Sequence, residues 1–336
     1  MIHMRVVIFT EAGGTSGHGH LARCVSLFQA FEDRNIAVDL VVEARGGSEL
    51  PEHLLPADGW EEVSWRKPGS HAFRTLDGDT VVVIDSYLAR EGVYRKAAAR
   101  AGLLLSMDDC RRIDYPPGIV LNPAPQASYM AYPRRHGTTY LLGPRYFCAR
   151  REFWSTPSRA ASIREDIKSV LVLFGGTDPR GLADVISGQI ALGFPSWQVH
   201  LVRGEERPGR IGYPNLRLHR QVAARDLIRL MEIADVAVSA AGQSLHELAA
   251  MGVPTVAVVV ADNQEVAADA WRRSGFITGF HRWNDESIEH NVIQELRSLR
   301  PRAPREERAR IGRRLVDGDG SRRTADAVIQ CMRRGA

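Results

Sequence analysis

The sequence has little of several features that mark specialised classes of protein. It contains only 4 cysteines in 336 residues, and none of them lies at the spacing of a zinc or thiol-redox motif. No apolar run reaches the ~18 residues of a membrane-spanning helix, and the first residues lack the apolar core of a secretory signal. We therefore expect a cytoplasmic protein with reduced thiols, no membrane span and no bound metal.

Charge of one sign is also not in large excess. The chain has 44 Lys and Arg residues against 40 Asp and Glu residues, for a net charge of +4. The excess lies in the arginine-rich segment from Arg300 to Arg334, in which no aromatic residue is interleaved for base stacking. A run of this kind is typical of a solvated helix face, so we expect no nucleic-acid partner.

The length and the hydrophobic pattern predict two similar lobes. A single core rarely grows beyond ~250–300 residues, so two lobes of about 150 residues are expected. In each half, short β-branched runs alternate with segments of helical periodicity, which is the pattern of a doubly wound parallel α/β sheet. We predict an N-terminal Rossmann-like lobe over residues 1–150, a linker within 148–167, a C-terminal Rossmann-like lobe over 165–305 and terminal basic helices over 306–336.

The strands of both lobes are predicted from apolar runs bounded by Gly, Pro or Asp. Ligands of open α/β sheets bind just outside the carboxyl ends of the strands, so functional residues are expected directly after them, in a cleft between the lobes. The predicted strands are Arg5–Phe9, Val38–Val42, Val81–Ile84, Leu103–Ser106 and Ile119–Leu121, then Val170–Phe174, Gln198–Val202, Leu216–His219, Val236–Ser239 and Thr255–Val259.

A glycine-rich segment, GGTSGHGHLAR from Gly13 to Arg23, follows the first strand. Glycines at the start of a helix let the backbone approach an anionic ligand. The segment lacks the lysine of a P-loop, which excludes that motif. A dinucleotide site stays open, because GHGHLA fits the relaxed GxGxxA form and Glu43 follows the second strand where a ribose-binding acid would lie.

His20 in this segment is the candidate catalytic residue. A histidine side chain titrates near pH ~6.5, so at neutral pH it is mostly a free base that can take a proton from water. Packing against the start of the helix is the alternative. We favour catalysis because Gly17 and Gly19, which we expect to contact the substrate, lie close to His20 in the chain.

Carboxylates follow the next two strands of the first lobe. Asp85 and Tyr87 end the run VVVIDSY, and both are candidate substrate-binding residues. Asp85 can orient a catalytic group or hold a sugar hydroxyl, and either residue can instead cap the next helix. Asp108 and Asp109 are adjacent and point to opposite sides of their strand, so they are a poor metal site, and we expect one of them to cap a turn.

Small and polar residues follow three strands of the second lobe. They predict a nucleotide site in which amides and hydroxyls hold phosphate and a carboxylate holds the ribose. These residues can instead cap helices without any ligand. Ser244 and Glu247 have the spacing of a capping box, and Asn263 can be an N-cap. The expected nucleotide-binding residues are Gly175, Gly176, Thr177, Gly242, Gln243, Ser244 and Glu247, and Asn263 and Gln264 are expected to bind the substrate's sugar or phosphate.

Several blocks of the sequence together resemble GT-B nucleotide-sugar enzymes. Within that superfamily they are most similar to the UDP-2,4-diacetamido-2,4,6-trideoxy-β-L-altropyranose hydrolases of pseudaminic acid biosynthesis. The resemblance covers most of the chain, in the family's order. The blocks are GHGHLAR, IDSY, SMDD, LNPAP, GPRYFCARREF, FGGTD, SAAG with HE, and NQE.

The resemblance implies a GT-B fold and a hydrolase. By residue, it implies His20 as the general base, Tyr87 beside it, Glu247 at the ribose and Asn263 at the sugar. Water would attack the anomeric carbon with inversion and release UDP without any cofactor, because the diphosphate already leaves readily and needs no protonating acid. The alternatives are a glycosyltransferase that uses the same UDP-sugar donor, an NAD-dependent oxidoreductase and a non-catalytic nucleotide-sugar sensor.

Overall fold

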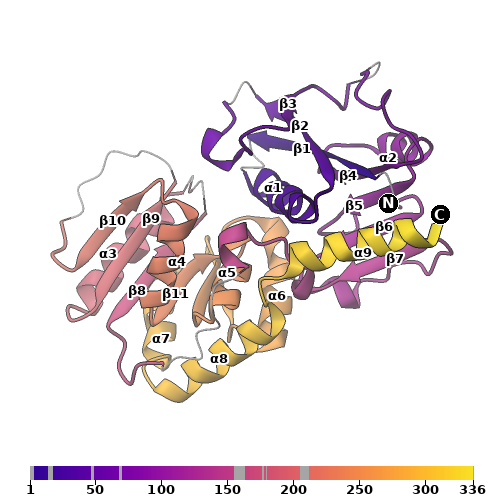
Figure 1. Cartoon of the computed structure of the whole chain (residues 1–336). Coiled ribbons are helices and arrows are strands. Elements are labelled where there is room, and N and C mark those ends of the chain that lie inside the picture. Colours follow the sequence, from indigo (N-terminus) through magenta and orange to yellow (C-terminus); the bar gives the residue numbers. More distant parts are fainter. Residues whose placement is uncertain are drawn as a thin grey trace. The chain divides into compact units, whose positions relative to one another are not determined.

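The structure is a computed structural model of the chain, and it divides into two compact units (Figure 1). Unit 1 comprises Met1–Arg151 and Gly318–Ala336, and unit 2 comprises Glu152–Asp317. The residues that the structure describes are 4–13, 18–46, 49–67, 70–154, 163–175, 178, 180–204 and 212–335.

Unit 1 is built on a parallel sheet with the strand order β3-β2-β1-β4-β5-β6-β7. β4 reads TVVVID and is buried along its whole length, as expected for a central strand that is covered on both faces. The strands are β1 (Arg5–Gly13), β2 (Ala37–Arg45), β3 (Trp60–Glu62), β4 (Thr80–Asp85), β5 (Leu103–Met107), β6 (Gly118–Asn122) and β7 (Thr138–Leu142).

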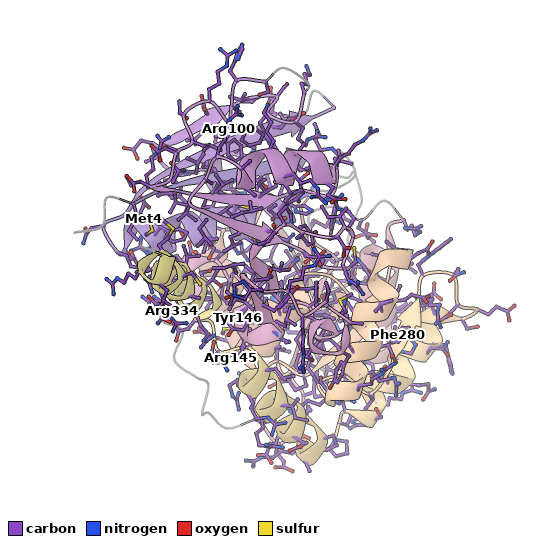
Figure 2. The ribbon with its side chains drawn as sticks, turned by 90° about the vertical axis from the view of Figure 1, so that its right-hand side faces the viewer. Met4, Arg100, Arg145, Tyr146, Phe280 and Arg334 are labelled. Atoms are coloured by element: carbon purple, nitrogen blue, oxygen red, sulfur yellow. The ribbon has the colours of Figure 1, made fainter. Side chains whose placement is uncertain are left out.

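The helices of unit 1 come from both ends of the chain. They are α1 (Gly19–Glu32), α2 (Glu91–Ala98) and the C-terminal helix α9 (Gly320–Gly335). α9 packs against α1, where the Ser26 and Ser321 hydroxyl oxygens are 2.6 Å apart. Only glycine fits at the start of α9, because a Cβ on Gly320 would lie 2.1 Å from the carbonyl oxygen of Phe147. Figure 2 shows Arg145 and Tyr146 beside this helix.

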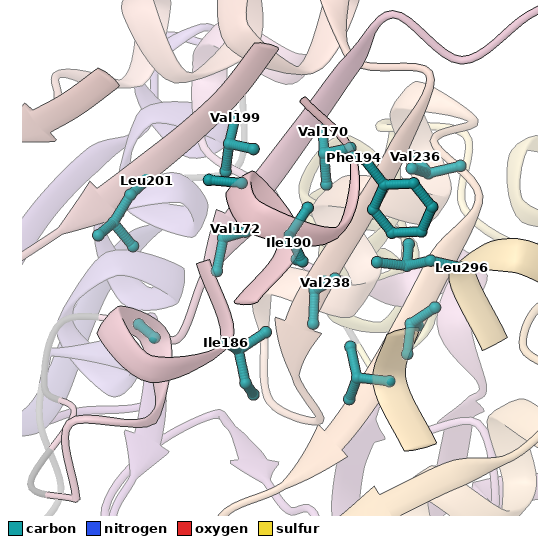
Figure 3. Packing of buried hydrophobic residues seen from close by; sticks show 14 of the residues in the cluster. Val170, Val172, Ile186, Ile190, Phe194, Val199, Leu201, Val236, Val238 and Leu296 are labelled. Carbon is teal, nitrogen blue, oxygen red and sulfur yellow. The ribbon is translucent and has the colours of Figure 1, made fainter. Parts of the chain in front are cut away.

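Unit 2 repeats the architecture with the strand order β10-β9-β8-β11-β12-β13, again all parallel. Its main core packs α3 and α7 on one face of the sheet, and Val170, Val199, Val236 and Leu296 are among its fully buried members (Figure 3). The strands are β8 (Ser169–Leu173), β9 (Gln198–Arg203), β10 (Leu216–Arg220), β11 (Val236–Ala240), β12 (Thr255–Val259) and β13 (Phe280–Arg282).

The helices of unit 2 include α8, which carries much of the basic C-terminal segment. They are α3 (Leu182–Gly193), α4 (Ala224–Ile233), α5 (Ser244–Met251), α6 (Glu265–Ser274), α7 (Ile288–Ser298) and α8 (Arg302–Leu315). α8 packs along α5, whereas α9 belongs to unit 1, so the segment 306–336 is divided between the two units. Across the described residues, no helix is both long and apolar enough to span a membrane.

The expectation of a solvated basic face is wrong for part of α8. Arg305 is fully buried and Arg308 is 4% exposed. The guanidinium of Arg305 donates to the carbonyl oxygens of Arg164 and Glu165, and that of Arg308 donates to the Thr278 hydroxyl. These arginines therefore fasten α8 to the rest of unit 2, because their long side chains reach acceptors that no local pattern reveals.

All ten strands predicted from the sequence are present, and the expectation of two doubly wound parallel sheets is confirmed. The prediction missed β3, β7 and β13. These strands lie at sheet edges and are three to five residues long, with polar residues such as the two glutamates of β3. An edge strand is not buried on both faces, so it lacks the continuous apolar run on which the prediction relied.

Candidate active site

The candidate catalytic residues of unit 1 lie where the strand order of its sheet reverses. β1 and β4 are neighbours although β2 and β3 separate them in sequence, and Thr10 of β1 pairs with Asp85 of β4. His20 is in the first turn of α1, after β1, and Asp85 is the last residue of β4. Ligands of open α/β sheets bind at such a reversal.

His20 is fixed by Asp85. Its Nδ1 lies 2.7 Å from Oδ1 of Asp85, and the two side chains are 5% and 1% exposed. An ionised carboxylate can only accept a hydrogen bond, so we assign the proton to Nδ1, which leaves the lone pair of a neutral ring on Nε2. Nε2 can then take a proton from a reacting hydroxyl while Asp85 stabilises the imidazolium that forms.

Arg23, one helical turn beyond His20, joins the same network. It donates two hydrogen bonds to Asp85, from Nε at 2.5 Å and from Nη2 at 2.6 Å. Its Nη1 donates to Asp109 at 2.8 Å. We did not predict a role for Arg23, although a charged residue within the apolar stretch LARCVSLF was a usable signal, because a buried arginine needs partners.

Opposite charges set the protonation of this network. Burial alone would raise the pKa of Asp85, but the charge of Arg23 and the contact with His20 outweigh it and hold that pKa well below its ordinary value. Burial would likewise raise the pKa of Asp109, but the charge of Arg23 outweighs burial, so the pKa of Asp109 is also lowered. Both carboxylates are therefore ionised at neutral pH, and Asp85 keeps its role as an acceptor.

Tyr87 packs against His20 from the end of β4. The two rings meet edge to face with centroids 4.4 Å apart, and the Tyr87 hydroxyl donates to Asp109 at 2.6 Å. Its backbone nitrogen donates to the fully buried Glu11 at 3.1 Å. Burial, followed by the charge of Asp109, raises the pKa of Tyr87, so its hydroxyl stays protonated and serves as a donor.

Glu43, the possible ribose-binding acid of the alternative dinucleotide site, forms an ion pair with Arg66. The Arg66 guanidinium donates to both carboxylate oxygens of Glu43, at 3.1 and 2.9 Å, and also lies 3.3 Å from Glu11. A ribose-binding acid keeps its oxygens for the ribose hydroxyls. This ion pair accounts for Glu43 without a ligand.

The adjacent carboxylates Asp108 and Asp109 differ as expected. Asp108 accepts hydrogen bonds from the backbone nitrogens of Cys110 and Arg111 and from the Tyr115 hydroxyl. It therefore holds the turn after β5, while Asp109 pairs with Arg23. Within the described ranges, no three His, Cys, Asp or Glu side chains gather as a potential metal site.

Unit 2 presents its predicted residues at the carboxyl ends of β8, β11 and β12. Gly175, after β8, has φ +82°, a conformation that favours glycine. After β11, a Cβ added to Gly242 would lie 3.7 Å from Nε2 of Gln264, so these two predicted residues are close together. The Gln264 side-chain oxygen accepts a hydrogen bond from Val260 at 3.0 Å.

The start of helix α5 does not form the capping box that was the alternative explanation for Ser244 and Glu247. It begins at Ser244, with Gln243 at the N-cap, and no side-chain hydrogen bond caps it there. A capping box with Glu247 requires Ser244 itself at the N-cap, but the N-cap lies one residue earlier, at Gln243, so the capping box cannot form. Glu247 lies in the first turn and is half-buried.

Some predicted residues cannot be placed. Gly17, Gly176 and Thr177 lie outside the described residues, and for Asn263 only the backbone, within the turn Asp262–Gln264, is described. Gly19 is the first residue of α1. The structure thus brings His20, Asp85 and Tyr87 together in unit 1, and Gly242 and Gln264 together in unit 2.

No family model matches the chain, and its sequence is distantly similar to two known proteins. The spore coat polysaccharide biosynthesis protein SpsG of Bacillus subtilis is 21% identical, over 97% of this chain and 98% of that protein. An uncharacterised protein of Methanocaldococcus jannaschii is 20% identical over 75% of this chain, which spans 55% of that protein's length.

Solved structures resemble the whole chain in fold. MurG of Acinetobacter baumannii has a TM-score of 0.66 at 13% identity, covering 97% of this chain and 99% of that one. UDP-GlcNAc 2-epimerase of Neisseria meningitidis, bound to UDP-GlcNAc, has a TM-score of 0.63 at 12% identity, covering 97% and 100%. The calicheamicin glycosyltransferase has a TM-score of 0.65 at 15% identity, covering 98% and 99%. The GT-B fold expected from the sequence is confirmed.

Proposed function

We propose that this protein is a nucleotide-sugar hydrolase that uses His20 as a general base on water. The observation that carries the proposal is the buried pair of His20 and Asp85, with 2.7 Å between Nδ1 and Oδ1, at the strand reversal of a Rossmann-like sheet. In this proposal unit 1 supplies the base and unit 2 supplies the groups that bind the nucleotide.

The substrate class follows from three supports. The structure neighbours include a UDP-GlcNAc 2-epimerase bound to UDP-GlcNAc, and a relative that matches over nearly its full length is a spore coat polysaccharide biosynthesis protein. The sequence blocks resemble the hydrolases of pseudaminic acid biosynthesis. We therefore propose a UDP-linked 2,4-diacetamido-2,4,6-trideoxy sugar as the substrate, with UDP and the free sugar as products.

The chemistry requires one base and stabilisation of the leaving diphosphate. Nε2 of His20 takes a proton from water as the water oxygen bonds to the anomeric carbon. The bond from that carbon to the diphosphate oxygen breaks, and its electron pair leaves with UDP. Attack from the face opposite the diphosphate inverts the configuration, and the oxygen from water ends in the sugar.

The test is release of UDP from the UDP-sugar in the absence of any acceptor. The wild type should release UDP and the free sugar in equal amounts, and His20→Ala should release far less. Absence of acceptor-independent UDP release from the wild type would refute hydrolysis as the activity.

Glycosyl transfer is a second candidate, which the exposed apolar side chains of unit 1 favour. Leu88, after β4, is 43% exposed, and Tyr129, after β6, is 77% exposed. Side chains of this kind at the carboxyl edge of the sheet suit an organic acceptor better than water. UDP release that depends on an added acceptor, with the sugar recovered on that acceptor, would favour this candidate over hydrolysis.

A further inference from the structure

Arg180 of unit 2 reaches across the carboxyl edge of its sheet. It belongs to the connection between β8 and α3, yet its Nη1 donates to the carbonyl oxygen of Val260, after β12, at 2.7 Å. Its guanidinium also lies 4.0 Å from the ring centroid of Trp283, after β13. β11 separates β8 from β12 in the sheet, so the side chain of Arg180 passes the end of β11.

The guanidinium therefore lies beside the predicted nucleotide-binding residues. Val260 accepts from Arg180 through its carbonyl oxygen and donates through its nitrogen to the side chain of Gln264. Gln264 in turn lies next to Gly242, which has no side chain to cover this part of the edge. Arg180, Gln264 and Gly242 thus form one continuous group at the ends of β11 and β12.

The part of the chain that the structure describes does not neutralise the positive charge of Arg180. Among the described residues no carboxylate pairs with it, and its contacts are a neutral carbonyl oxygen and an aromatic face. Two other arginines near these strand ends are paired, Arg203 with Asp184 and Arg282 with Glu265. An exposed arginine is normally free to move, but stacking on Trp283 and the bond to Val260 hold this one in place.

We propose that Arg180 binds the diphosphate of the nucleotide substrate and that Trp283 positions it. A guanidinium presents several N–H donors in a planar fork that matches phosphate oxygens, and the carbonyl of Val260 occupies only one nitrogen. This inference rests on the proposed function, because that function places a nucleotide diphosphate on unit 2. In the reaction, Arg180 would also stabilise the negative charge that develops on the leaving UDP.

The test is calorimetric titration of the full chain with UDP, uridine and inorganic pyrophosphate. Arg180→Gln should weaken binding of UDP and of pyrophosphate by about 10- to 100-fold, the cost of losing hydrogen bonds between charged groups. Uridine has no phosphate, so its affinity should not change. Arg229→Gln is the matched control, because Arg229 lies on α4 of the same unit and is 76% exposed, and it should leave all three affinities unchanged.

Two further variants distinguish binding by the positioned planar donors of the guanidinium from binding by positive charge alone. Arg180→Lys keeps the charge but loses the planar donors, so it should restore only part of the UDP affinity. Trp283→Leu should weaken UDP binding less than Arg180→Gln does. Equal affinity of wild type and Arg180→Gln for UDP would overturn the proposal while leaving the proposed function intact.

Two other outcomes distinguish failure of the Arg180 site from failure of the proposed function. Binding of pyrophosphate that depends on Arg180, without binding of UDP, would support the anion site and contradict the UDP-sugar function. If the wild type binds none of the three probes, both the inference and the proposed function are wrong.

Discussion

The two units hold their candidate functional groups in opposite physical settings. In unit 1, His20, Arg23 and Asp85 are at most 5% exposed and are joined by short charged hydrogen bonds. In unit 2, the edge presents glycines, the exposed Gln243 and Arg180, and the half-buried Glu247. A proton transfer needs one fixed donor and acceptor geometry, whereas an anionic ligand needs open backbone and unpaired charge.

This difference predicts that substitutions in the two units have separable effects. A change in the network of unit 1 should lower turnover and leave nucleotide binding intact, because the proposed nucleotide-binding groups belong to the other unit. A change at the edge of unit 2 should weaken binding and leave the chemical step nearly intact. Kinetic constants and direct binding measurements distinguish these outcomes.

The largest effect is expected from His20→Ala. Loss of the general base should lower kcat by about 10² to 10⁴-fold, while calorimetric affinity for UDP stays at the wild-type value. His18→Ala is the matched control, because His18 lies two residues earlier, is exposed and makes no side-chain cap bond to α1. Near-normal turnover of His20→Ala would remove this residue from the mechanism.

Asp85→Asn should come next, with kcat lowered by about 10² to 10³-fold. The amide keeps the shape of the side chain but no longer stabilises the imidazolium or fixes the proton on Nδ1. The measurement is steady-state UDP release from the same substrate at several concentrations. A rise in KM at constant kcat would show that Asp85 serves binding and not proton transfer.

Glu247→Gln should produce the converse result in unit 2. We expect KM for the UDP-sugar to rise by about 10- to 100-fold because the charged hydrogen bond that we propose between Glu247 and the ribose would be lost, with little change in kcat. UDP affinity measured by calorimetry should fall by a similar factor. Unchanged affinity for UDP would place the ribose elsewhere.

Acid should weaken unit 1 through Asp85. Its pKa is lowered in the folded state, so its stabilisation is complete above the unfolded value of ~3.9 and is lost as pH falls through that value toward the lowered pKa. Asp85→Asn should lower the free energy of unfolding by about 3 kcal/mol at neutral pH. Denaturant titrations should show this difference shrinking below about pH 4, and a difference that does not depend on pH would contradict the ion-pair account.

The smallest effect is expected from Tyr87→Phe. The substitution removes the 2.6 Å hydrogen bond to Asp109 but keeps the ring that packs on His20. A single hydrogen bond at a side chain that is 37% exposed predicts a loss of kcat of about 5-fold. Tyr87→Ala, which also removes the ring, should cost more, and equal losses in the two variants would assign the whole effect to the hydroxyl and contradict a role for the ring.

The sequence revealed most of what depends on local pattern. Buried parallel strands such as β4 read as continuous apolar runs, and the glycine-rich segments after them are the basis of the predicted ligand-binding sites. Asp85 and Tyr87 were predicted as site residues because they end or follow such a strand, and His20 because it lies in the glycine-rich segment that follows β1, at the start of α1. The short edge strand β3 carries no comparable signal.

Pairing between distant residues could not be predicted from the sequence. Arg23 meets Asp85 across 62 residues and Asp109 across 86, and only the strand order brings these three together. Arg180 likewise gains its contacts with Val260 and Trp283 because β8, β12 and β13 end at the same edge. Side chains that act through tertiary partners leave little trace in local spacing.

In the proposed mechanism, His20 activates water for attack on the anomeric carbon of a UDP-sugar. Turnover in heavy-oxygen water, followed by mass spectrometry of both products after a short reaction, tests this step. The account predicts the heavy oxygen at the anomeric position of the released sugar and none in UDP. Label in the phosphate of UDP would show cleavage at phosphorus and would contradict the mechanism.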